Sequence, residues 1–211
     1  MISDDLLEYA EFYSTQELTI LEKLSRETHL TQVYPRMMAG TMQGTFLRLI
    51  GEMMKPRRIL EIGTFTGYSA LCFAASLPES GLLHTIEVNP EQEEVIRRYI
   101  QESGLGKKII LHIGDAKTVI PSLEEIWDLV YIDADKPNYL AYYHLIFEHV
   151  RPGGFILADN TLWDGKVLNE RSGMDKDTLG IEEFNDFIHH DARVDNLLLP
   201  FRDGIMMIRK H

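Results

Sequence analysis

The first quarter of the chain places an apolar residue at every third or fourth position, the spacing that gathers side chains on one face of an α-helix. In the stretch 3–55 this pattern is carried, for example, by Leu18, Leu21 and Leu24. Pro56 ends the pattern, because proline cannot continue a helix. This part of the chain is therefore expected to form helices and no strand.

After residue 57 the pattern changes to short apolar runs that alternate with helical stretches. Strands separated by helices form βαβ units, whose strands lie parallel in one sheet. The turn between the last two runs is too short for a crossover helix, so those two strands are expected to pair antiparallel. The expected strands are 58–62, 82–87, 109–113, 127–132, 155–158, 194–199 and 204–209.

Together these elements predict an α/β fold: a Rossmann-like seven-stranded, mainly parallel sheet with an antiparallel C-terminal strand, helices on both faces and extra N-terminal helices. A length of 211 residues suits one domain. We therefore expect a single domain over 1–211, with N-terminal helices in 1–55 and the Rossmann-like core in 56–211. A polar stretch with two glycines, 163–178, is the expected loop insertion.

Composition narrows the function more than it narrows the fold. Apolar residues make up 45% and charged residues 26%, which is usual for a globular protein. The formal net charge is −12, so nucleic acid and an acidic membrane surface are disfavoured partners. No apolar run approaches the roughly 20 residues that span a bilayer, the first residues show no leader pattern, and Cys72 is the lone cysteine. A cytoplasmic protein without an internal disulfide is expected.

The turn after the first predicted strand is the first candidate binding motif. Residues 61–69 read Glu-Ile-Gly-Thr-Phe-Thr-Gly-Tyr-Ser and lie where a Rossmann-type sheet binds its cofactor. In a dinucleotide-binding turn a glycine stands at the position of Phe65, where it lets the backbone approach a pyrophosphate. A bulky side chain there favours a ligand without phosphate, although a glycine turn between strand and helix is also a common feature of α/β folds.

Two acids end the next strands. Glu87 closes the second strand, where a carboxylate can accept hydrogen bonds from a ribose diol. Asp115 follows the third strand and can accept from an exocyclic amine such as that of adenine. A nucleoside without phosphates that is approached by acids fits the cationic S-adenosylmethionine. Each acid taken alone can instead be a helix N-cap.

A second group of polar residues follows the fourth and fifth strands. Asp133, Asp159 and Asn160 converge at the carboxyl edge of the sheet if these strands are neighbours. Two carboxylates and an amide oxygen suit Mg²⁺ or a similar divalent cation such as Ca²⁺ or Mn²⁺, and do not suit zinc. The alternative is that Asp135 caps a helix begun by Pro137 and that 159–160 is only a turn.

A divalent cation beside a methyl donor has a clear chemical use. A phenol titrates near a pKa of about 10, so almost none of it is the nucleophilic phenolate at neutral pH. A cation that holds the oxygen lowers this pKa and fixes the oxygen in line with the methyl group. Lys136, three residues after Asp133, can accept the phenolic proton; alternatively it is a solvated lysine at a helix start.

In six segments the chain resembles the cation-dependent class I O-methyltransferases, the group that includes catechol and caffeoyl-CoA O-methyltransferases. The resemblance covers about 30–210 and is specific because the segments occur in the same order and spacing. They are 61–69, 86–90, 114–116, 132–139, 151–154 and 159–163.

The resemblance implies roles for particular residues and a homodimeric assembly. It implies that Asp133, Asp159 and Asn160 hold the metal, that Lys136 is the base, and that Lys136, Asp133 and Asn160 form the catalytic group. Met37 and Ala39 belong to an N-terminal stretch that lies over the cofactor in the family, although by spacing alone they would be core residues. The implied S-adenosylmethionine contacts are Met37, Ala39, Glu61, Gly63, Thr64, Phe65, Ser69, Glu87, Asp115, Ala116 and Asp133.

The acceptor is the least defined part of the prediction. We expect a vicinal dihydroxy-aromatic small molecule, with Tyr139, Trp163 and Arg171 as pocket walls. A second hypothesis is the 5-hydroxyuridine of tRNA, which bacterial relatives methylate; it would need a local basic patch on this acidic chain. Residues available for such a patch are Arg36, Lys55, Arg57, Arg58, Lys107 and Lys108. A third hypothesis, a non-catalytic cofactor-binding module, would be expected to lack a metal ligand or the lysine.

Overall fold

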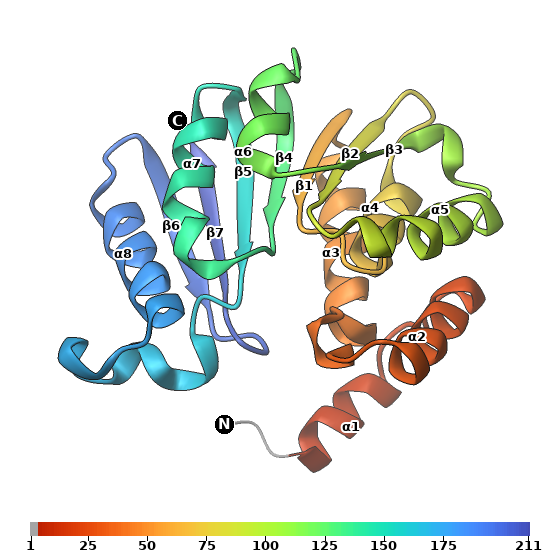
Figure 1. Ribbon diagram of the computed structural model, residues 1–211, viewed down its shortest axis with the longest axis horizontal. Coiled ribbons are helices and arrows are strands. Elements are labelled where there is room, and N and C mark those ends of the chain that lie inside the picture. Colours follow the sequence, from red (N-terminus) through yellow and green to blue (C-terminus); the bar gives the residue numbers. More distant parts are fainter. Residues whose placement is uncertain (1–3) are drawn as a thin grey trace.

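The computed structural model describes residues 4–211, and its centre is a seven-stranded sheet (Figure 1). The strand order is β3-β2-β1-β4-β5-β7-β6. The first five strands pair in parallel, and β7 pairs antiparallel with both β5 and β6. The strands are β1 (Arg58–Ile62), β2 (Leu82–Glu87), β3 (Ile109–Ile113), β4 (Trp127–Ile132), β5 (Val150–Asp159), β6 (Val194–Leu199) and β7 (Ile205–Lys210). The predicted mainly parallel sheet with an antiparallel C-terminal strand is confirmed.

One strand is longer than its sequence indicates. The prediction placed the fifth strand at 155–158, but β5 begins at Val150, which pairs with Trp127. The intervening Arg-Pro-Gly-Gly sequence, 151–154, reads as a turn, and the ladder accommodates it by a register shift between Trp127 and Leu129. Tertiary pairing therefore extends a strand through residues that are poor strand formers on their own.

Helices cover both faces of the sheet, and three of them precede it. The predicted N-terminal helical segment forms α1, α2 and α3; its residue 3 lies outside the described part of the chain. Lys55 ends α3 in a left-handed conformation with φ 49°, just before the predicted stop at Pro56. The helices are α1 (Asp4–Phe12), α2 (Thr19–Thr31), α3 (Gly40–Met54), α4 (Tyr68–Ser76), α5 (Glu93–Glu102), α6 (Ala116–Val119), α7 (Tyr139–Phe147) and α8 (Lys176–His190).

The predicted insertion 163–178 is shorter and more ordered than expected. It contains two 3-10 segments, Trp163–Leu168 and Arg171–Gly173, and it ends where α8 begins at Lys176. Asp175 sets this boundary, because its side chain accepts a hydrogen bond from the backbone N–H of Thr178 at 2.7 Å. The capping aspartate was part of the stretch that the sequence analysis assigned to the loop.

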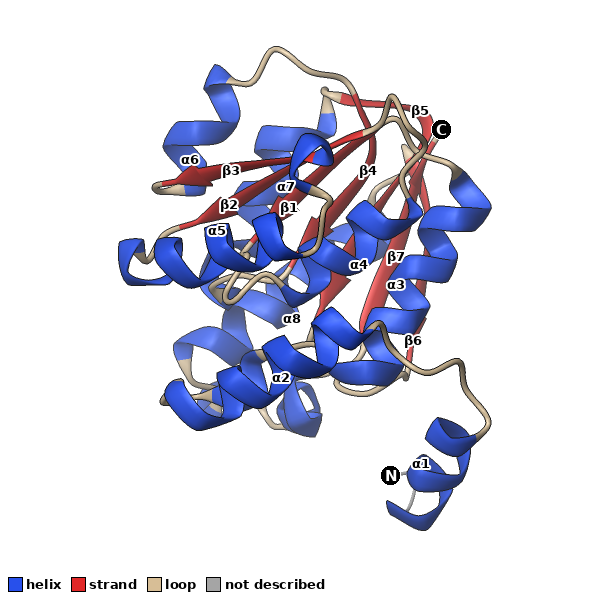
Figure 2. Ribbon diagram, turned by 90° about the vertical axis from the view of Figure 1, so that its right-hand side faces the viewer, coloured by secondary structure: helices blue, strands red, loops and turns tan. Residues whose placement is uncertain are grey.

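The sheet divides the core into two apolar clusters, as the alternation of side chains along each strand requires. In β1, Leu60 contributes to the cluster beneath α7 and α8, together with Tyr143 and Phe184. Ile59 contributes to the cluster on the other face, with Leu47 of α3 and others. Figure 2 shows these helix layers on the two sides of the strands. The carboxyl ends of the parallel strands are left free between the layers.

The first helix differs from the others because it stands apart from the sheet and its covering helices (Figure 2). Its apolar side chains are largely exposed: Leu6 is 60%, Tyr9 63% and Phe12 79% exposed. Across residues 4–211, each helix is too short or too polar to cross a bilayer.

Candidate active site

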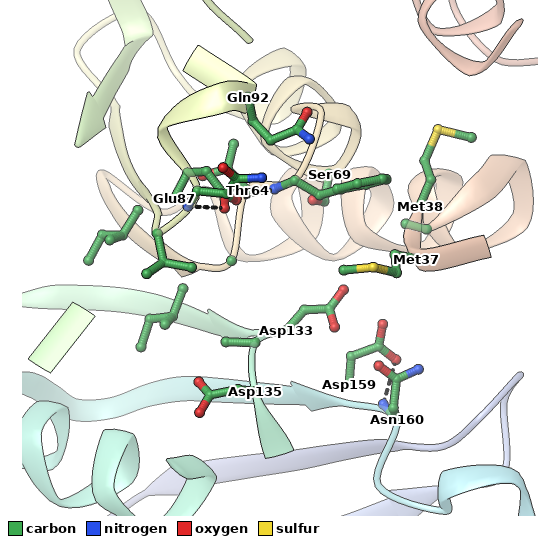
Figure 3. Close-up of a pocket in the computed structure, with 18 of the residues that line it drawn as sticks. Met37, Met38, Thr64, Ser69, Glu87, Gln92, Asp133, Asp135, Asp159 and Asn160 are labelled. Atoms are coloured by element: carbon green, nitrogen blue, oxygen red, sulfur yellow. Dashed lines mark hydrogen bonds between the residues drawn. The ribbon is translucent and has the colours of Figure 1, made fainter. Parts of the chain in front are cut away.

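A cavity of about 1420 Å³ opens at the carboxyl edge of the sheet. The loops after β1, β2, β3, β4 and β5 all contribute to its wall, and the segment before α3 closes one side. Open α/β sheets bind ligands at this edge. Both groups of polar residues singled out in the sequence therefore meet in one cavity, whose central part is shown in Figure 3.

The turn after β1 depends on a glycine for close approach to β4. Gly63 has φ +96°, and a Cβ built on it would lie 1.9 Å from the carbonyl oxygen of Asp133. Its N–H donates to the carbonyl of Ile86 at 3.0 Å, which ties the turn to β2 as well. A side chain at this position is excluded by both the backbone conformation and the space available.

Phe65 holds the backbone position that would be glycine in a dinucleotide-binding turn. It adopts a left-handed conformation with φ 51°, which is unusual for an aromatic residue. Its N–H donates to Oε2 of Glu87 at 2.7 Å. The donor that a glycine turn would offer to a pyrophosphate is therefore already used by a protein carboxylate, which agrees with a ligand without phosphate.

Glu87 ends β2 and is held facing the cavity by two backbone groups. Oε2 accepts from Phe65, and Oε1 accepts from the N–H of Asn89 at 2.8 Å. Each carboxylate oxygen keeps a second lone pair, so the pair of oxygens can still accept from two neighbouring hydroxyls. This orientation fits the predicted ribose contact.

Asp115 is a helix N-cap, which was the alternative to a ligand contact, and it also lines the cavity. Its Oδ1 accepts from the N–H of Lys117 at 2.8 Å and caps α6. The second oxygen has no such backbone partner, and the residue lies in the cavity wall next to Ala116. Capping and ligand binding are therefore compatible at this residue.

Glu61 is the predicted cofactor contact that the structure places elsewhere. It is fully buried within β1 and does not line the cavity. One oxygen accepts from the hydroxyl of Thr85, and the other, Oε1, has no partner. Burial raises the pKa of this carboxyl to about 8, and the hydrogen bond from Thr85 opposes this rise. The cofactor contact expected for Glu61 therefore stays a prediction: in this structure its carboxylate is enclosed by its neighbours.

The remaining predicted cofactor residues lie in the cavity wall. Met37 and Ala39 enter it from the turn before α3, so the N-terminal helices and the sheet share one cavity. Met37 is 59% exposed, which does not agree with a core role, whereas Ala39 is buried. The cavity residues among those predicted to bind the cofactor are Met37, Ala39, Gly63, Thr64, Phe65, Ser69, Glu87, Asp115, Ala116 and Asp133.

The three predicted metal ligands lie close together in the cavity, across from Glu87 in the view of Figure 3. The ammonium of Lys136 donates to Oδ1 of Asp133 at 3.3 Å and to Oδ1 of Asn160 at 2.8 Å. The side-chain oxygens of Asp133 and Asn160 therefore face the same point, which the ammonium group of Lys136 occupies. Asn160 reaches this position through a left-handed backbone with φ 57°.

Asp159 lies beside this pair and is held by buried neighbours. Its Oδ2 accepts from the hydroxyl of Tyr131 at 2.9 Å and from the side-chain amide of Gln43. Its Oδ1 accepts from the N–H of Asn160 at 2.8 Å. Only 3% of this aspartate is exposed, so its charge is not stabilised by bulk water.

The oxygen set fits a hard divalent cation better than it fits zinc. Two carboxylates and an amide oxygen converge, whereas no group of three His, Cys, Asp or Glu side chains in residues 4–211 is placed to hold a metal. Burial raises the pKa of Asp133 above its usual value, and the charge of Lys136 opposes this shift. The buried carboxylate of Asp159 and the partly buried one of Asp133, with one lysine between them, favour a further positive charge.

Lys136 is not the solvated lysine that the alternative required. It is 7% exposed, and its third contact is a donation to the hydroxyl of Tyr139 at 2.6 Å. Asp135 stands at the N-cap position of the following turn, but its side chain is bound by Tyr142 and Asn138 and accepts no capping hydrogen bond from the backbone.

The three residues predicted to form the acceptor pocket differ in their positions. Trp163 lines the cavity. Tyr139 is fully buried and donates to the carbonyl of Asp159 at 3.0 Å. It therefore supports the backbone at the end of β5 and does not line the cavity itself. Arg171 lies outside the cavity and pairs with Glu182 and Glu183 on α8. Neither Tyr139 nor Arg171 forms the wall as predicted: Tyr139 is enclosed at the start of α7, and the segment after Trp163 carries Arg171 toward α8.

Gln43 and Arg202 line the cavity close to the predicted metal ligands and were not predicted from the sequence. Gln43 is 2% exposed on α3 and contacts Asp159, and a polar residue on the apolar face of a helix was the available signal. Arg202 donates to Oε1 of Gln43 at 2.8 Å from the loop between β6 and β7. No pattern in the sequence indicates that this loop returns to the cavity.

Comparison with known proteins agrees with this geometry. A family model described as O-methyltransferase matches residues 11–211. A catechol O-methyltransferase from Niastella koreensis is 36% identical, over 78% of this chain and 76% of its own length. A caffeoyl-CoA O-methyltransferase from Stellaria longipes is 32% identical, over 90% of this chain and 83% of its own length. The crystal structure of an O-methyltransferase from Bacillus cereus in complex with SAH superposes with a TM-score of 0.91 at 27% identity, covering 98% of this chain and 97% of the other. The chain belongs to the O-methyltransferase family.

Proposed function

We propose that the protein transfers a methyl group from S-adenosylmethionine to one hydroxyl of a catechol-like, vicinal dihydroxy-aromatic small molecule, with the help of a divalent cation. The observation that carries this proposal is the convergence of Asp133, Asp159 and Asn160 in the same cavity as the acids at the ends of β2 and β3. The related O-methyltransferases named above support methyl transfer to oxygen.

The cofactor would lie along the loops after β1, β2 and β3. Glu87 would accept from the ribose hydroxyls, and the free oxygen of Asp115 would accept from the adenine amine. Met37 and Ala39 would cover the methionine end, which brings the methyl group toward Asp133. The neighbour from Bacillus cereus holds SAH, the demethylated product of this cofactor, which supports the same ligand here.

Asp133, Asp159 and Asn160 would hold Mg²⁺, or Ca²⁺ or Mn²⁺ in its place. When bound, the cation would lower the pKa of the acceptor hydroxyl and fix the two substrate oxygens. Lys136, whose Nζ already lies among these oxygens, would take the proton of the attacking hydroxyl when its side chain is the neutral amine. A carbon–oxygen bond then forms as the carbon–sulfur bond of the cofactor breaks. Trp163 in the cavity wall would stack beside the aromatic ring.

The tRNA hypothesis has less support from the positions of the basic residues. Lys55 and Arg57 precede β1, Arg58 is its first residue, and Lys107 and Lys108 precede β3. All five therefore lie at the amino edge of the parallel strands. The cavity lies at the carboxyl edge, and of the patch predicted for tRNA only Arg36 lines it. The net charge of −12 points in the same direction.

The test is methyl transfer from labelled S-adenosylmethionine to catechols and, in parallel, to tRNA that contains 5-hydroxyuridine. We expect labelled catechol, loss of labelling with EDTA, recovery with Mg²⁺, and at least about a 100-fold loss in Asp159→Ala, because changes that only disturb metal ligands cost 10- to 100-fold. Asp195→Ala removes an exposed carboxylate on β6 and serves as the matched control. Labelling of tRNA alone would favour the second hypothesis, and transfer that survives EDTA would contradict the metal site.

We also propose that residues 1–211 act as one methyltransferase domain and that two copies assemble through α1. The single domain is supported by the shared cavity, in which Met37 of segment 1–55 and Asp133 of segment 56–211 both take part. The dimer is supported by the exposed Tyr9 and Phe12 on a helix that stands apart. Light scattering should show a dimer that becomes a monomer in the double variant Tyr9→Asp, Phe12→Asp. A cytoplasmic location stays a prediction from the sequence.

A further inference from the structure

Two arginines lie in the cavity wall, and the charge of one of them, Arg202, also acts on Asp133. Arg36 and Arg202 both line the cavity, and among the described side chains neither forms an ion pair. Most of the other arginines do pair with a carboxylate, as expected for a chain with 33 acidic and 21 basic residues. Both residues are exposed, so water solvates their guanidinium groups, and their positive charge is available to a ligand that enters the cavity.

Arg202 is held in place by its loop. It has a left-handed backbone with φ 51°, a conformation that glycine or asparagine adopts more readily than arginine. The N–H of Leu162 donates to the carbonyl of Asp203 at 2.9 Å, and the N–H of Thr161 donates to the carbonyl of Gly204 at 3.1 Å. The loop is thereby fastened to the residues that directly follow Asn160. The neighbouring Asp203 carboxylate accepts from the N–H of Asp164 instead of pairing with the arginine.

The guanidinium of Arg202 lies one amide group away from the proposed metal site. It donates to Oε1 of Gln43 at 2.8 Å, and the Nε2 of that amide donates to Asp159. Gln43 is neutral, so this hydrogen bond orients the guanidinium without cancelling its charge. Arg202 lines the same cavity as Trp163, Asp133 and Asn160, where the proposed function places the ring and the hydroxyls of the substrate.

We infer that the natural acceptor carries a carboxylate on its dihydroxy-aromatic ring and that Arg202 is the residue that selects it. The inference rests on the proposed function and specifies its substrate class. Arg202 binds the carboxylate through the nitrogens that Gln43 leaves free. Other acids of the cavity wall, such as Asp115 and Asp177, repel a carboxylate elsewhere in the cavity, which favours its binding near Arg202.

The test compares two acceptors of equal size, 3,4-dihydroxybenzoate and 3,4-dihydroxybenzamide, with the full chain, S-adenosylmethionine and Mg²⁺. The wild-type protein should have the higher kcat/KM for the acid. Arg202→Asn should lower the acid-to-amide ratio of kcat/KM by about 10- to 100-fold, the size expected for a lost hydrogen bond between charged groups. Asparagine suits the left-handed backbone, so the loop is kept. Arg57→Asn, at the opposite edge of the sheet, should leave the ratio unchanged.

The ratio separates selection from general damage. A disturbance of Gln43 or Asp159 lowers both rates together and leaves the ratio as it was, and this outcome would overturn the inference. A wild-type preference for the amide would overturn it as well. If neither compound is methylated, the proposed function fails, and calorimetric binding of the two compounds to the protein with SAH and Mg²⁺ decides the inference separately. Tighter binding of the acid that Arg202→Asn abolishes would uphold it, and equal or absent binding of the acid would reject it.

Discussion

The cofactor half and the acceptor half of the cavity differ in how the chain builds them. The cofactor half consists of successive turns, each placed by the strand that ends there, as at Gly63, Glu87 and Asp115. The acceptor half joins segments that are far apart: Gln43 and Arg202 are 159 positions apart and share a hydrogen bond. The first half follows from local sequence, whereas the second exists only when the whole fold is complete.

This difference explains which parts of the site the sequence could predict. A glycine after an apolar strand and an acid at the end of the next one can be read locally, because parallel strands bring their carboxyl ends together. Arg202 follows a hairpin strand, and nothing nearby in the sequence indicates that Gln43 is its partner. Arg171, by contrast, was expected in the pocket because it follows Trp163, but the acids of α8 hold it outside.

The largest expected effect is on the cofactor half, from Gly63→Ala. The added Cβ would lie 1.9 Å from the carbonyl oxygen of Asp133, in a backbone conformation with φ +96°. We expect a loss of about 2–5 kcal/mol in the free energy of unfolding, from backbone strain and overpacking together. Urea denaturation measures this loss.

Gly173→Ala is the matched control, because a Cβ there has nothing within 4 Å and the residue does not have a positive φ. Its unfolding free energy should stay within about 0.5 kcal/mol of the wild type, as for most surface changes. If Gly63→Ala is equally mild, the close contact between the turn and β4 is not a constraint on the cofactor half.

A smaller effect is expected from Glu87→Gln. One carboxylate oxygen becomes an amide nitrogen, so the backbone N–H of either Phe65 or Asn89 loses its acceptor. The ribose hydroxyls also lose a charged hydrogen-bond acceptor. Affinity for SAH should fall by about 10- to 100-fold, the range for hydrogen bonds to charged groups. Calorimetry measures it, with Glu91→Gln, an exposed acid in the same wall, as the comparison. A comparable loss in both variants would indicate a general charge effect instead of a ribose contact.

The buried acid behind the cofactor half should make stability depend on pH. Burial raises the pKa of Glu61 from 4.5 to about 8, so between these values the folded protein keeps a proton that the unfolded chain has released. Stability from this residue is therefore complete below pH 4.5 and is lost as the pH rises toward about 8. Between pH 5 and 8 we expect a fall of about 1–3 kcal/mol that Glu61→Gln removes. Chemical denaturation at several pH values measures the slope, which the exposed Glu124→Gln should retain.

The smallest effect, and the one that separates the two halves most directly, is expected from Gln43→Leu. Leucine fills the buried space but leaves Asp159 and Arg202 without their shared partner. Such a loss amounts to about 1–3 kcal/mol, so methyl transfer should fall by roughly tenfold. In Gln43→Leu, kcat/KM for the acceptor should fall more than the affinity for SAH. In Glu87→Gln we expect the opposite order, with the larger loss in SAH affinity. Gln101→Leu, on the exposed side of α5, controls for the substitution itself. Equal losses of transfer and SAH affinity in Gln43→Leu would mean that the two halves form one energetic unit, in which the N-terminal helices position both ligands together.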